Sequence, residues 1–145
     1  PNLMQFASLP DPAFTNFDLT VEAKQLAGNP QSSYGVLFRM QGPEQFYRFE
    51  ITGNGQYIVE KRDVGGVWTR FVEDWADSPA INQGIGVTNQ LRVVANGGLF
   101  TVYANDILLA EFSDSSYTLG GIGLDAGTFG GSTQVSFDNL IVREP

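Results

Sequence analysis

The stretch FYRFEITGNGQYIVEKR, residues 46–62, decides the fold, because two alternating runs flank a turn signal, GNG at 53–55. A three-residue loop at the turn places Arg48 directly opposite Glu60 on the neighbouring strand. A two-residue Asn-Gly turn would instead set Phe49 against Glu60, and such a slip inverts which side chains are buried. The three-residue loop separates apolar from charged side chains better, so we expect that register.

The expected register gives this hairpin an inner and an outer face. The inner face holds Tyr47, Phe49, Ile51, Tyr57 and Val59, and the outer face holds Phe46, Arg48, Glu50, Ile58, Glu60 and Arg62. A four-residue turn at 41–44 extends the pattern, because it pairs Phe38 with Tyr47, Val36 with Phe49 and Arg39 with Phe46. That pairing adds Tyr34, Val36 and Phe38 to the inner face, and Leu37 and Arg39 to the outer face.

The rest of the chain repeats the same period of two, with turn signals at short intervals and no helical period sustained for three turns. This pattern predicts an all-β, two-sheet antiparallel β-sandwich or jelly roll of about ten to twelve strands. We expect strands near 3–7, 17–25, 34–40, 45–52, 56–62, 67–73, 89–96, 99–105, 107–113, 120–126 and 134–142. The connection 74–88 is the one extended loop.

Length and composition indicate one domain over residues 1–145, since 145 residues with 42% hydrophobic and 17% charged content suit one globular core. The sequence contains no linker, charge block or internal repeat. It begins at Pro1 without an initiator methionine, so we expect a piece processed or excised from a longer protein.

The charge balance excludes several partners. The formal net charge is −8, with two lysines and six scattered arginines, which argues against nucleic acid and anionic membrane surfaces. No apolar run reaches about 18 residues, so we expect no membrane insertion. Zero cysteine leaves no disulfide and no thiolate metal site, and the compartment stays open on this ground.

Several segments occur in a fixed order: YGVLFR at 34–39, FYRFEITGNGQY at 46–57, VWTRFVEDW at 67–75, SPAI at 78–81, TNQLRVVANG at 88–97, GGIGL at 120–124 and FDNLIV at 137–142. Together they resemble the bacterial laminin-G-like and concanavalin A-like jelly-roll domains, in particular those related to the 3-keto-disaccharide hydrolase type. The resemblance covers almost the whole chain from Phe17 to Val142.

The resemblance implies two antiparallel sheets, one convex and one concave. It also implies an accessory module of extracellular, periplasmic or cell-surface proteins that binds carbohydrate or another polymer. One hairpin that often carries Asn-Gly in the family reads Asn105-Asp106 here, which predicts a small local change of turn.

Catalytic signatures are weak. The Glu-x-Asp-x-x-Glu pattern of glucan-cleaving enzymes with this fold is absent, and zero histidine rules out a Ser-His-Asp triad. The densest acidic cluster, Glu73-Asp74 with Asp77, lies in a loop signature and fits a solvated or cation-binding loop better than a catalytic pair. GTFGGS at 127–132 predicts a turn, because it lacks the lysine and helix of a phosphate-binding loop. We therefore expect no enzyme.

No cofactor is required, but a structural calcium ion fits the composition. Carboxylate and carbonyl oxygens are the ligands this cation prefers, and modules that resemble this chain often tie their terminal strands with it. Asp138, Asp18 and Asp11 are the candidate ligands. The alternative for Asp138 is a hydrogen bond to backbone within a strand pair.

The candidate ligand-binding residues lie on the outer face and in the long loop. They are Arg39, Phe46, Arg48, Glu50, Glu60, Arg62 and Trp75. Forked guanidinium donors, carboxylate acceptors and aromatic rings suit a polar neutral ligand such as a sugar. The alternative is a set of cross-strand ion pairs on a wet sheet, each worth about 0.2 to 1 kcal/mol. We expect Trp75 to be exposed and Trp68 to pack in the core.

Three functions follow from these residues. The first is a noncatalytic recognition module that binds a glycan or similar polar polymer on the concave sheet face. The second is a protein-interaction or structural domain that assembles through a sheet face or edge. The third is a glycosidase-like enzyme acting through Asp or Glu alone.

Overall fold

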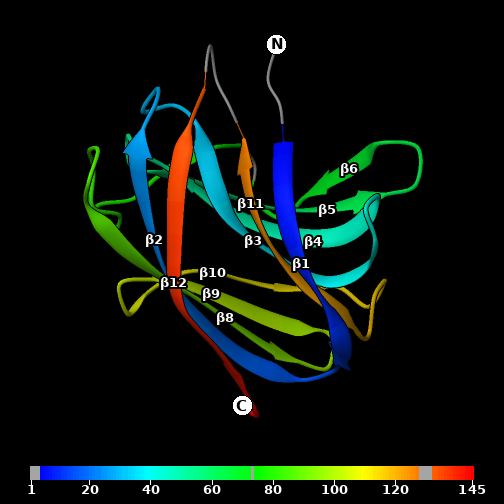
Figure 1. The fold of residues 1–145 in the computed structure, drawn as a ribbon. Helices are drawn as coiled ribbons and strands as arrows, with labels where there is room; N and C mark the ends of the chain where they lie inside the picture. The colour runs from blue at the N-terminus through cyan, green and yellow to red at the C-terminus, as the bar shows by residue number, and fades with distance from the viewer. Residues whose placement is uncertain (1–3, 73, 128–131) are drawn as a thin grey trace.

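The computed structural model describes residues 4–72, 74–127 and 132–145, with side chains from Phe14 onward. Within these residues all regular structure is β-strand, arranged in two stacked antiparallel sheets (Figure 1). The seven-stranded sheet runs β1 (Met4–Phe14), β11 (Gly120–Gly127), β3 (Ser33–Gly42), β4 (Gln45–Thr52), β5 (Gln56–Asp63) and β6 (Val67–Arg70), with β7 (Ala76–Asp77) also paired to β5. The five-stranded sheet runs β10 (Ile107–Ser113), β9 (Leu99–Ala104), β8 (Thr88–Asn96), β2 (Phe17–Ala27) and β12 (Gln134–Arg143). The expected β-sandwich is confirmed, and no helix that could cross a membrane occurs in the described chain.

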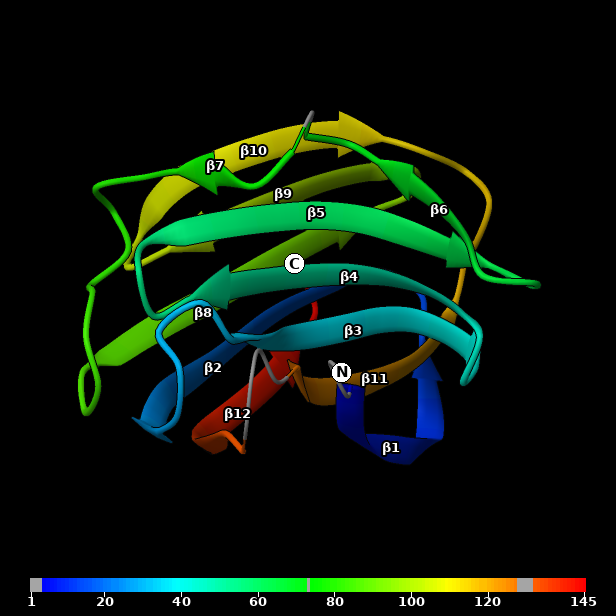
Figure 2. The same cartoon turned by 90° about the horizontal axis from the view of Figure 1, so that it is seen from above.

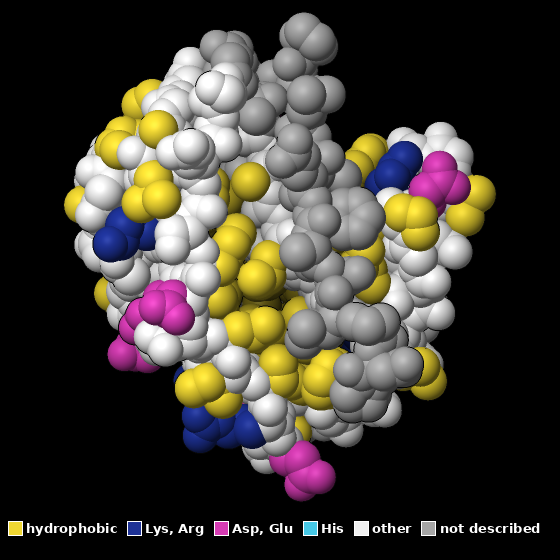
Figure 3. Space-filling view, viewed as in Figure 1, with side chains coloured by type: hydrophobic (Ala, Val, Ile, Leu, Met, Phe, Trp, Pro, Cys, Tyr) yellow, Lys and Arg dark blue, Asp and Glu magenta, His cyan; other side chains and the backbone are white. Residues whose placement is uncertain are grey.

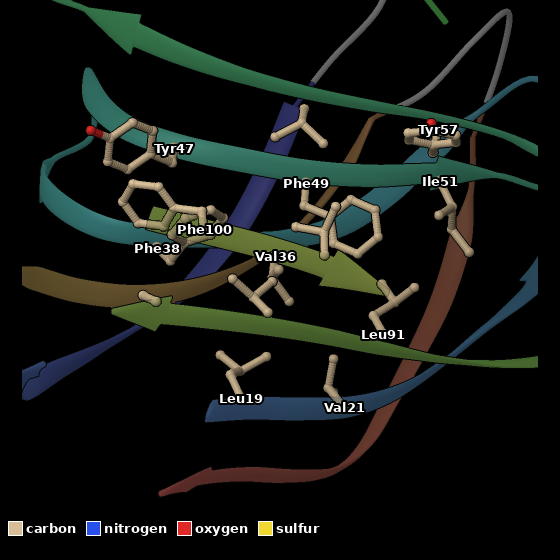
Figure 4. Close-up of a cluster of buried hydrophobic side chains, with 14 of the residues drawn as sticks. Leu19, Val21, Val36, Phe38, Tyr47, Phe49, Ile51, Tyr57, Leu91 and Phe100 are labelled. Atoms are coloured by element: carbon tan, nitrogen blue, oxygen red, sulfur yellow. The ribbon is translucent and has the colours of Figure 1, made fainter. Parts of the chain in front are cut away.

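The core lies between the sheets because alternate residues of each strand point inward. On β2, Leu19, Val21 and Ala23 are fully buried while the residues between them are partly exposed. Figure 4 shows Leu19, Val21, Leu91 and Phe100 from the five-stranded sheet facing the inner residues of β3, β4 and β5. The inner face expected for the 46–62 hairpin is therefore confirmed as core.

The expected register of the central hairpin is also confirmed. Arg48 pairs with Glu60 and Phe49 with Val59, while β4 ends at Thr52 and β5 begins at Gln56. The loop is closed by the Gly55 amide, which donates to the Thr52 carbonyl at 3.1 Å. The loop can turn this sharply because Gly55 has a φ of 88°.

The expected pairing of Arg39 with Phe46 is wrong. The register between β3 and β4 shifts after Phe38, and the next pair is Gly42 with Gln45, so a bulge replaces the regular ladder. Arg39 has a φ of 48°, and its guanidinium lies 4.8 Å from the ring of Phe100 in the core. The bulge turns this side chain to the inside, so Arg39 does not belong to the outer face.

The turn between β9 and β10 keeps the geometry of the common Asn-Gly hairpin. Asn105 and Asp106 have φ values of 53° and 68°, the positive signs that a two-residue type I′ turn requires. The Asn105 side chain also donates to the Ala80 carbonyl at 2.8 Å. The expected change of turn does not occur, because asparagine and aspartate tolerate the left-handed region.

The inward side chains are less completely buried on the β12 side of the sandwich. The inward residues of β12, including Val135, Phe137 and Val142, remain partly exposed although they pack against the core. Figure 3 shows hydrophobic side chains in the middle of this side of the molecule.

Candidate functional site: a pocket on the outer face of the seven-stranded sheet

The outer face is the side of the seven-stranded sheet turned away from the core, and Figure 2 looks onto the strands that form it. It carries Leu37, Phe46, Arg48, Glu50, Ile58, Glu60, Trp68 and Asp125. Leu37, Phe46 and Ile58 are at most 1% exposed, although none of them belongs to the core cluster between the sheets. Much of the outer face is therefore buried and is not the wet surface that the sequence allowed.

Arg48 is the centre of this layer. Its guanidinium donates to Glu60 on β5, and its Nε lies 3.2 Å from Glu50 Oε1. The side chains of Arg48, Glu50 and Glu60 are 16%, 0% and 4% exposed. The cross-strand ion pair expected from the register is thus present, but it is buried, where removal of one partner costs far more than at a wet surface.

Trp68 covers the Arg48 guanidinium, 4.5 Å from the ring centroid to Cζ, and meets Phe46 edge-on at 5.9 Å. It is 38% exposed, so the expectation that Trp68 packs in the core is wrong. The turn at 64–66 pairs Trp68 with Arg62, which puts both on the outer face. The sequence signal that could have placed Trp68 on the outer face is the alternation of side chains, continued through the Gly65-Gly66 turn.

A pocket of about 270 Å³ opens beside this cluster, lined by Arg48, Ile58, Glu60, Trp68, Arg70 and Trp75. The chain forms it because β5 pairs with β6 at one end and β7 at the other, leaving a connecting segment between them. Phe71 at the start of that segment turns inward and stacks on Phe112 at 4.4 Å. Trp75 at its end is half-buried and forms a wall of the pocket, so the expectation that Trp75 is the exposed tryptophan is wrong.

The charged residues of the pocket wall form ion pairs. Arg70 Nη1 donates to Asp74 at 3.1 Å, and its Nε lies 3.9 Å from Glu60 Oε2. Glu60 therefore stands between two guanidinium groups, those of Arg48 and Arg70. Burial raises the pKa of Glu60, and Arg48 opposes that rise. The arrangement presents donors, an acceptor and two indole rings to one small space.

Behind Arg48 lies a buried pair of carboxyl groups, those of Glu50 and Asp125. The sequence analysis identified Glu50 as a candidate but not Asp125. Asp125 on β11 pairs with Gly35 on β3, and Gly35 pairs with Glu50 on β4. Because glycine has no side chain, the two carboxyl groups meet across it. Burial raises the pKa of Asp125 well above its usual range, and the neighbouring Glu50 raises it further.

The Asp125 shift predicts a pH-dependent stability. Between about pH 3.9, the usual aspartate value, and the raised pKa, the folded chain holds a proton that the unfolded chain releases. Stability contributed by this group is therefore lost as pH rises through that window. We expect Asp125→Asn to melt at a higher temperature than the wild type at pH 8, with the difference shrinking toward pH 4.5. Thermal melts across this range measure it.

Asp18→Asn is the matched control, because its shift has the opposite sign. A hydrogen bond from Arg92 holds the pKa of Asp18 below its usual value, so its contribution is present at neutral pH and lost as pH falls. This variant should melt lower than the wild type at pH 8. A melting difference for Asp125→Asn that stays constant from pH 4.5 to 8 contradicts the assignment.

The structure places the other candidate site residues apart from this pocket. Arg62 lies on the outer face with its guanidinium 5.7 Å from Trp68, but it does not line the pocket. Phe46 is fully buried beneath Trp68. Asp74 pairs with Arg70, which fits the solvated-loop interpretation, whereas Glu73 and residues 128–131 of the glycine-rich stretch lie outside the described residues.

The candidate calcium ligands do not converge in the described part of the chain. Asp18 binds Arg92 through both oxygens, at 2.9 and 2.7 Å. Asp138 accepts from the backbone amide of the next residue, Asn139, at 2.8 Å, which is a bond within one strand and not the bond within a strand pair that the alternative expected. The side chain of Asp11 lies outside the described residues, and those described hold no group of three or more acidic side chains arranged for a metal ion. Calcium binding stays a prediction.

A larger hollow of about 600 Å³ lies at the other end of the molecule, lined by Phe14, Thr15, Asn16 and 142–145. It offers one aromatic ring and no cluster of paired charges. The smaller outer pocket brings two tryptophans, two arginines and a glutamate together. Convergent polar groups in a concave site are the better indicator of ligand binding, so we take the outer pocket as the site.

Solved structures with a similar fold have low sequence identity to the chain. Carbohydrate-binding module CBM66 from Bacillus subtilis matches with a TM-score of 0.74 and 17% identity, over 92% of this chain and 78% of that one. Sheep galectin-11, in a complex with glycerol, matches with a TM-score of 0.65 and 16% identity, over 97% and 96%. CG-16, a homodimeric agglutinin from chicken liver, matches with a TM-score of 0.68 and 12% identity, over 96% and 100%. At these identities the likeness establishes the jelly-roll fold.

The sequence itself matches one known family, although no curated protein matches it. The match covers residues 5–143, nearly the whole chain, and agrees with the resemblance carried by the segments from YGVLFR to FDNLIV. The chain therefore belongs to the 3-keto-alpha-glucoside-1,2-lyase-like domain family.

Proposed function

We propose that this protein is a noncatalytic recognition module that binds carbohydrate in the outer pocket. The observation that carries the proposal is the pocket itself, in which Trp68 and Trp75 stand beside Arg48, Glu60 and Arg70. Indole rings pack against the apolar faces of a sugar ring, while charged donors and acceptors hydrogen-bond its hydroxyl groups. The pocket therefore supplies both kinds of contact that a sugar needs.

The preorganisation of the pocket supports binding. Arg48 is held by Glu60 and Glu50, and its guanidinium lies under Trp68 before any ligand arrives. Side chains already fixed by such contacts lose little conformational entropy when a ligand binds. A rigid sheet with paired charges thus serves recognition without further rearrangement.

The comparisons support the same proposal by analogy. The similar structures named above include a carbohydrate-binding module and a galectin, and both share the two-sheet architecture of this chain. The family name refers to a lyase, but this chain has no histidine, and Asp125, whose raised pKa would suit an acid catalyst, is only 1% exposed and does not line the pocket. We therefore place binding before catalysis. The proposal also assigns the chain to the extracellular space, the periplasm or the cell surface.

Intrinsic fluorescence tests the proposal directly, because the chain contains two tryptophans and both line the pocket. We expect a glycan ligand, found by array screening, to change the tryptophan emission as it saturates the site. Trp75→Ala should raise the dissociation constant at least about tenfold, since buried aromatic contacts dominate binding energy. Isothermal titration with the same ligand provides the dissociation constant.

Tyr103→Ala is the matched control. Tyr103 is an aromatic residue on the five-stranded sheet, where its ring stacks on Arg92 at 5.0 Å, far from the pocket lining. Its loss should leave the dissociation constant unchanged. Binding that weakens equally in both variants, or an array on which no glycan is bound, removes the proposal in favour of a protein-interaction domain.

A further inference from the structure

We propose that the outer pocket selects neutral sugars and that Glu60 is the residue that excludes acidic ones. This inference rests on the proposed function, because it concerns the ligand class of the same pocket. It follows from how the charges around the pocket are paired, and from which of them faces the ligand space.

The arginines of the outer face already have carboxylate partners. Arg48 is paired with Glu60 and Glu50, Arg70 lies 3.1 Å from Asp74, and Arg62 Nη2 lies 4.0 Å from Glu44. Each of these three guanidinium groups thus has a carboxylate within 4.0 Å. A carboxylate or sulfate on a ligand would have to displace Glu60 or Glu50 from the buried Arg48, and the loss of that pair offsets the gain from the new ion pair.

Glu60 adds a repulsive element. It is the acidic member of the pocket lining, its side chain is 4% exposed, and it stands between Arg48 and Arg70. An anionic ligand in the pocket would come close to its carboxylate, and like charges at short range repel each other. Discrimination between similar ligands commonly needs such an unfavourable contact with the wrong one. A neutral sugar instead meets an acceptor for its hydroxyl groups.

The charge of the whole chain acts in the same direction. A formal net charge of −8 disfavours the approach of a polyanionic glycan, although salt screens this longer-range part. The pocket is also small, at about 270 Å³, below the usual range for drug-sized ligands. It suits a few polar contacts to a short stretch of sugar better than a run of charged groups.

The test compares matched ligands on the wild-type protein. The probes are the methyl glycosides of glucose, galactose and mannose, each paired with the methyl glycoside of its uronic acid, titrated by tryptophan fluorescence at pH 7. We expect at least one neutral glycoside to bind at least tenfold more tightly than its uronic acid. Equal affinity, or preference for the acid, overturns the inference and leaves the proposed function standing. No binding by any of the six glycosides overturns the inference, whereas the proposed function falls only if no glycan on the array binds either.

Glu60→Gln tests the role of the single residue. The substitution removes the negative charge and keeps the shape and an acceptor oxygen, so the affinity ratio of neutral to acidic glycoside should fall at least fivefold. Glu111→Gln, at an exposed position on β10, is the matched control and should leave the ratio unchanged. An unchanged ratio in a folded Glu60→Gln protein shows that Glu60 is not the selective residue.

A second variant keeps the test decisive if Glu60→Gln does not fold. Arg70→Gln removes one of the two guanidinium groups beside Glu60, and Arg70 is 48% exposed, so the fold should tolerate the change. With less positive charge near Glu60, the preference for the neutral glycoside should increase. A preference that decreases in Arg70→Gln contradicts the electrostatic account of the selectivity.

Discussion

Arg39→Met should lower the free energy of unfolding by about 3 kcal/mol, because it removes hydrogen bonds to several separate segments of the chain at once. The Arg39 guanidinium donates to the Gly97 carbonyl at 2.6 Å, the Tyr117 carbonyl at 3.1 Å and the Thr15 carbonyl at 2.7 Å. Methionine fills much of the same volume but donates no hydrogen bond. Partly buried carbonyl oxygens are then left without their donor, and each such loss is unfavourable.

Urea denaturation monitored by circular dichroism measures this effect. The control is Arg92→Met, since Arg92 is 37% exposed on the five-stranded sheet and pairs with Asp18 near solvent. An exposed ion pair of this kind contributes about 1 kcal/mol at most. If both variants lose the same small amount of unfolding free energy, the hydrogen bonds of Arg39 do not stabilise the fold as predicted.

Gly35→Ala should be at least as destabilising, at about 3 kcal/mol or more. A Cβ atom at position 35 would lie 2.0 Å from the Phe49 carbonyl oxygen and 2.8 Å from Glu50 Cα. Both are backbone atoms of β4, so the strand itself would have to move. That movement would also separate Asp125 from Glu50, whose carboxyl groups meet across Gly35.

Gly42→Ala is the control from the same strand. A Cβ atom at position 42 would meet no atom within 4 Å, and Gly42 does not have a positive φ. Its replacement should be neutral or slightly stabilising, because alanine reduces the freedom of the unfolded chain. Similar midpoints of urea unfolding for the two variants would argue against the close approach of β3 and β4 at Gly35.

The sequence was sufficient for the sheet faces of the central hairpin. The placement of Phe49 inside and Arg48 outside depends on a period of two and on one turn, GNG at 53–55, and both are local properties. The same logic predicted the Arg48–Glu60 pair, which the structure confirms. Alternation and turn chemistry therefore predicted the part of the site that lies on β4 and β5.

The sequence was not sufficient for Arg39, because its position depends on distant groups. Its acceptors at Thr15, Gly97 and Tyr117 lie 24, 58 and 78 residues away along the chain. Strand alternation alone put the side chain on the outer face, whereas the bulge after Phe38 reversed it. A bulge leaves no signal in a hydrophobic pattern as short as this one.

The burial of the site residues also could not be predicted from the local sequence pattern. Glu50 and Glu60 were expected on a solvent-exposed sheet, yet in the structure both are at most 3% exposed. Two residues from other strands contribute to this burial. They are Trp68 on β6 and Asp125 on β11, which lies across Gly35. Such burial depends on which strands become neighbours, so it could not be read from the hairpin alone.

The central claim is that a sugar binds in the pocket beside Trp68 and Trp75, and a crystal structure with a neutral oligosaccharide from the array screen tests it most directly. We expect a sugar ring packed against one or both indole rings, with hydroxyl groups bonded to Glu60 and Arg70. A sugar found instead in the hollow beside Phe14, or on the outer side of the five-stranded sheet, would contradict the account.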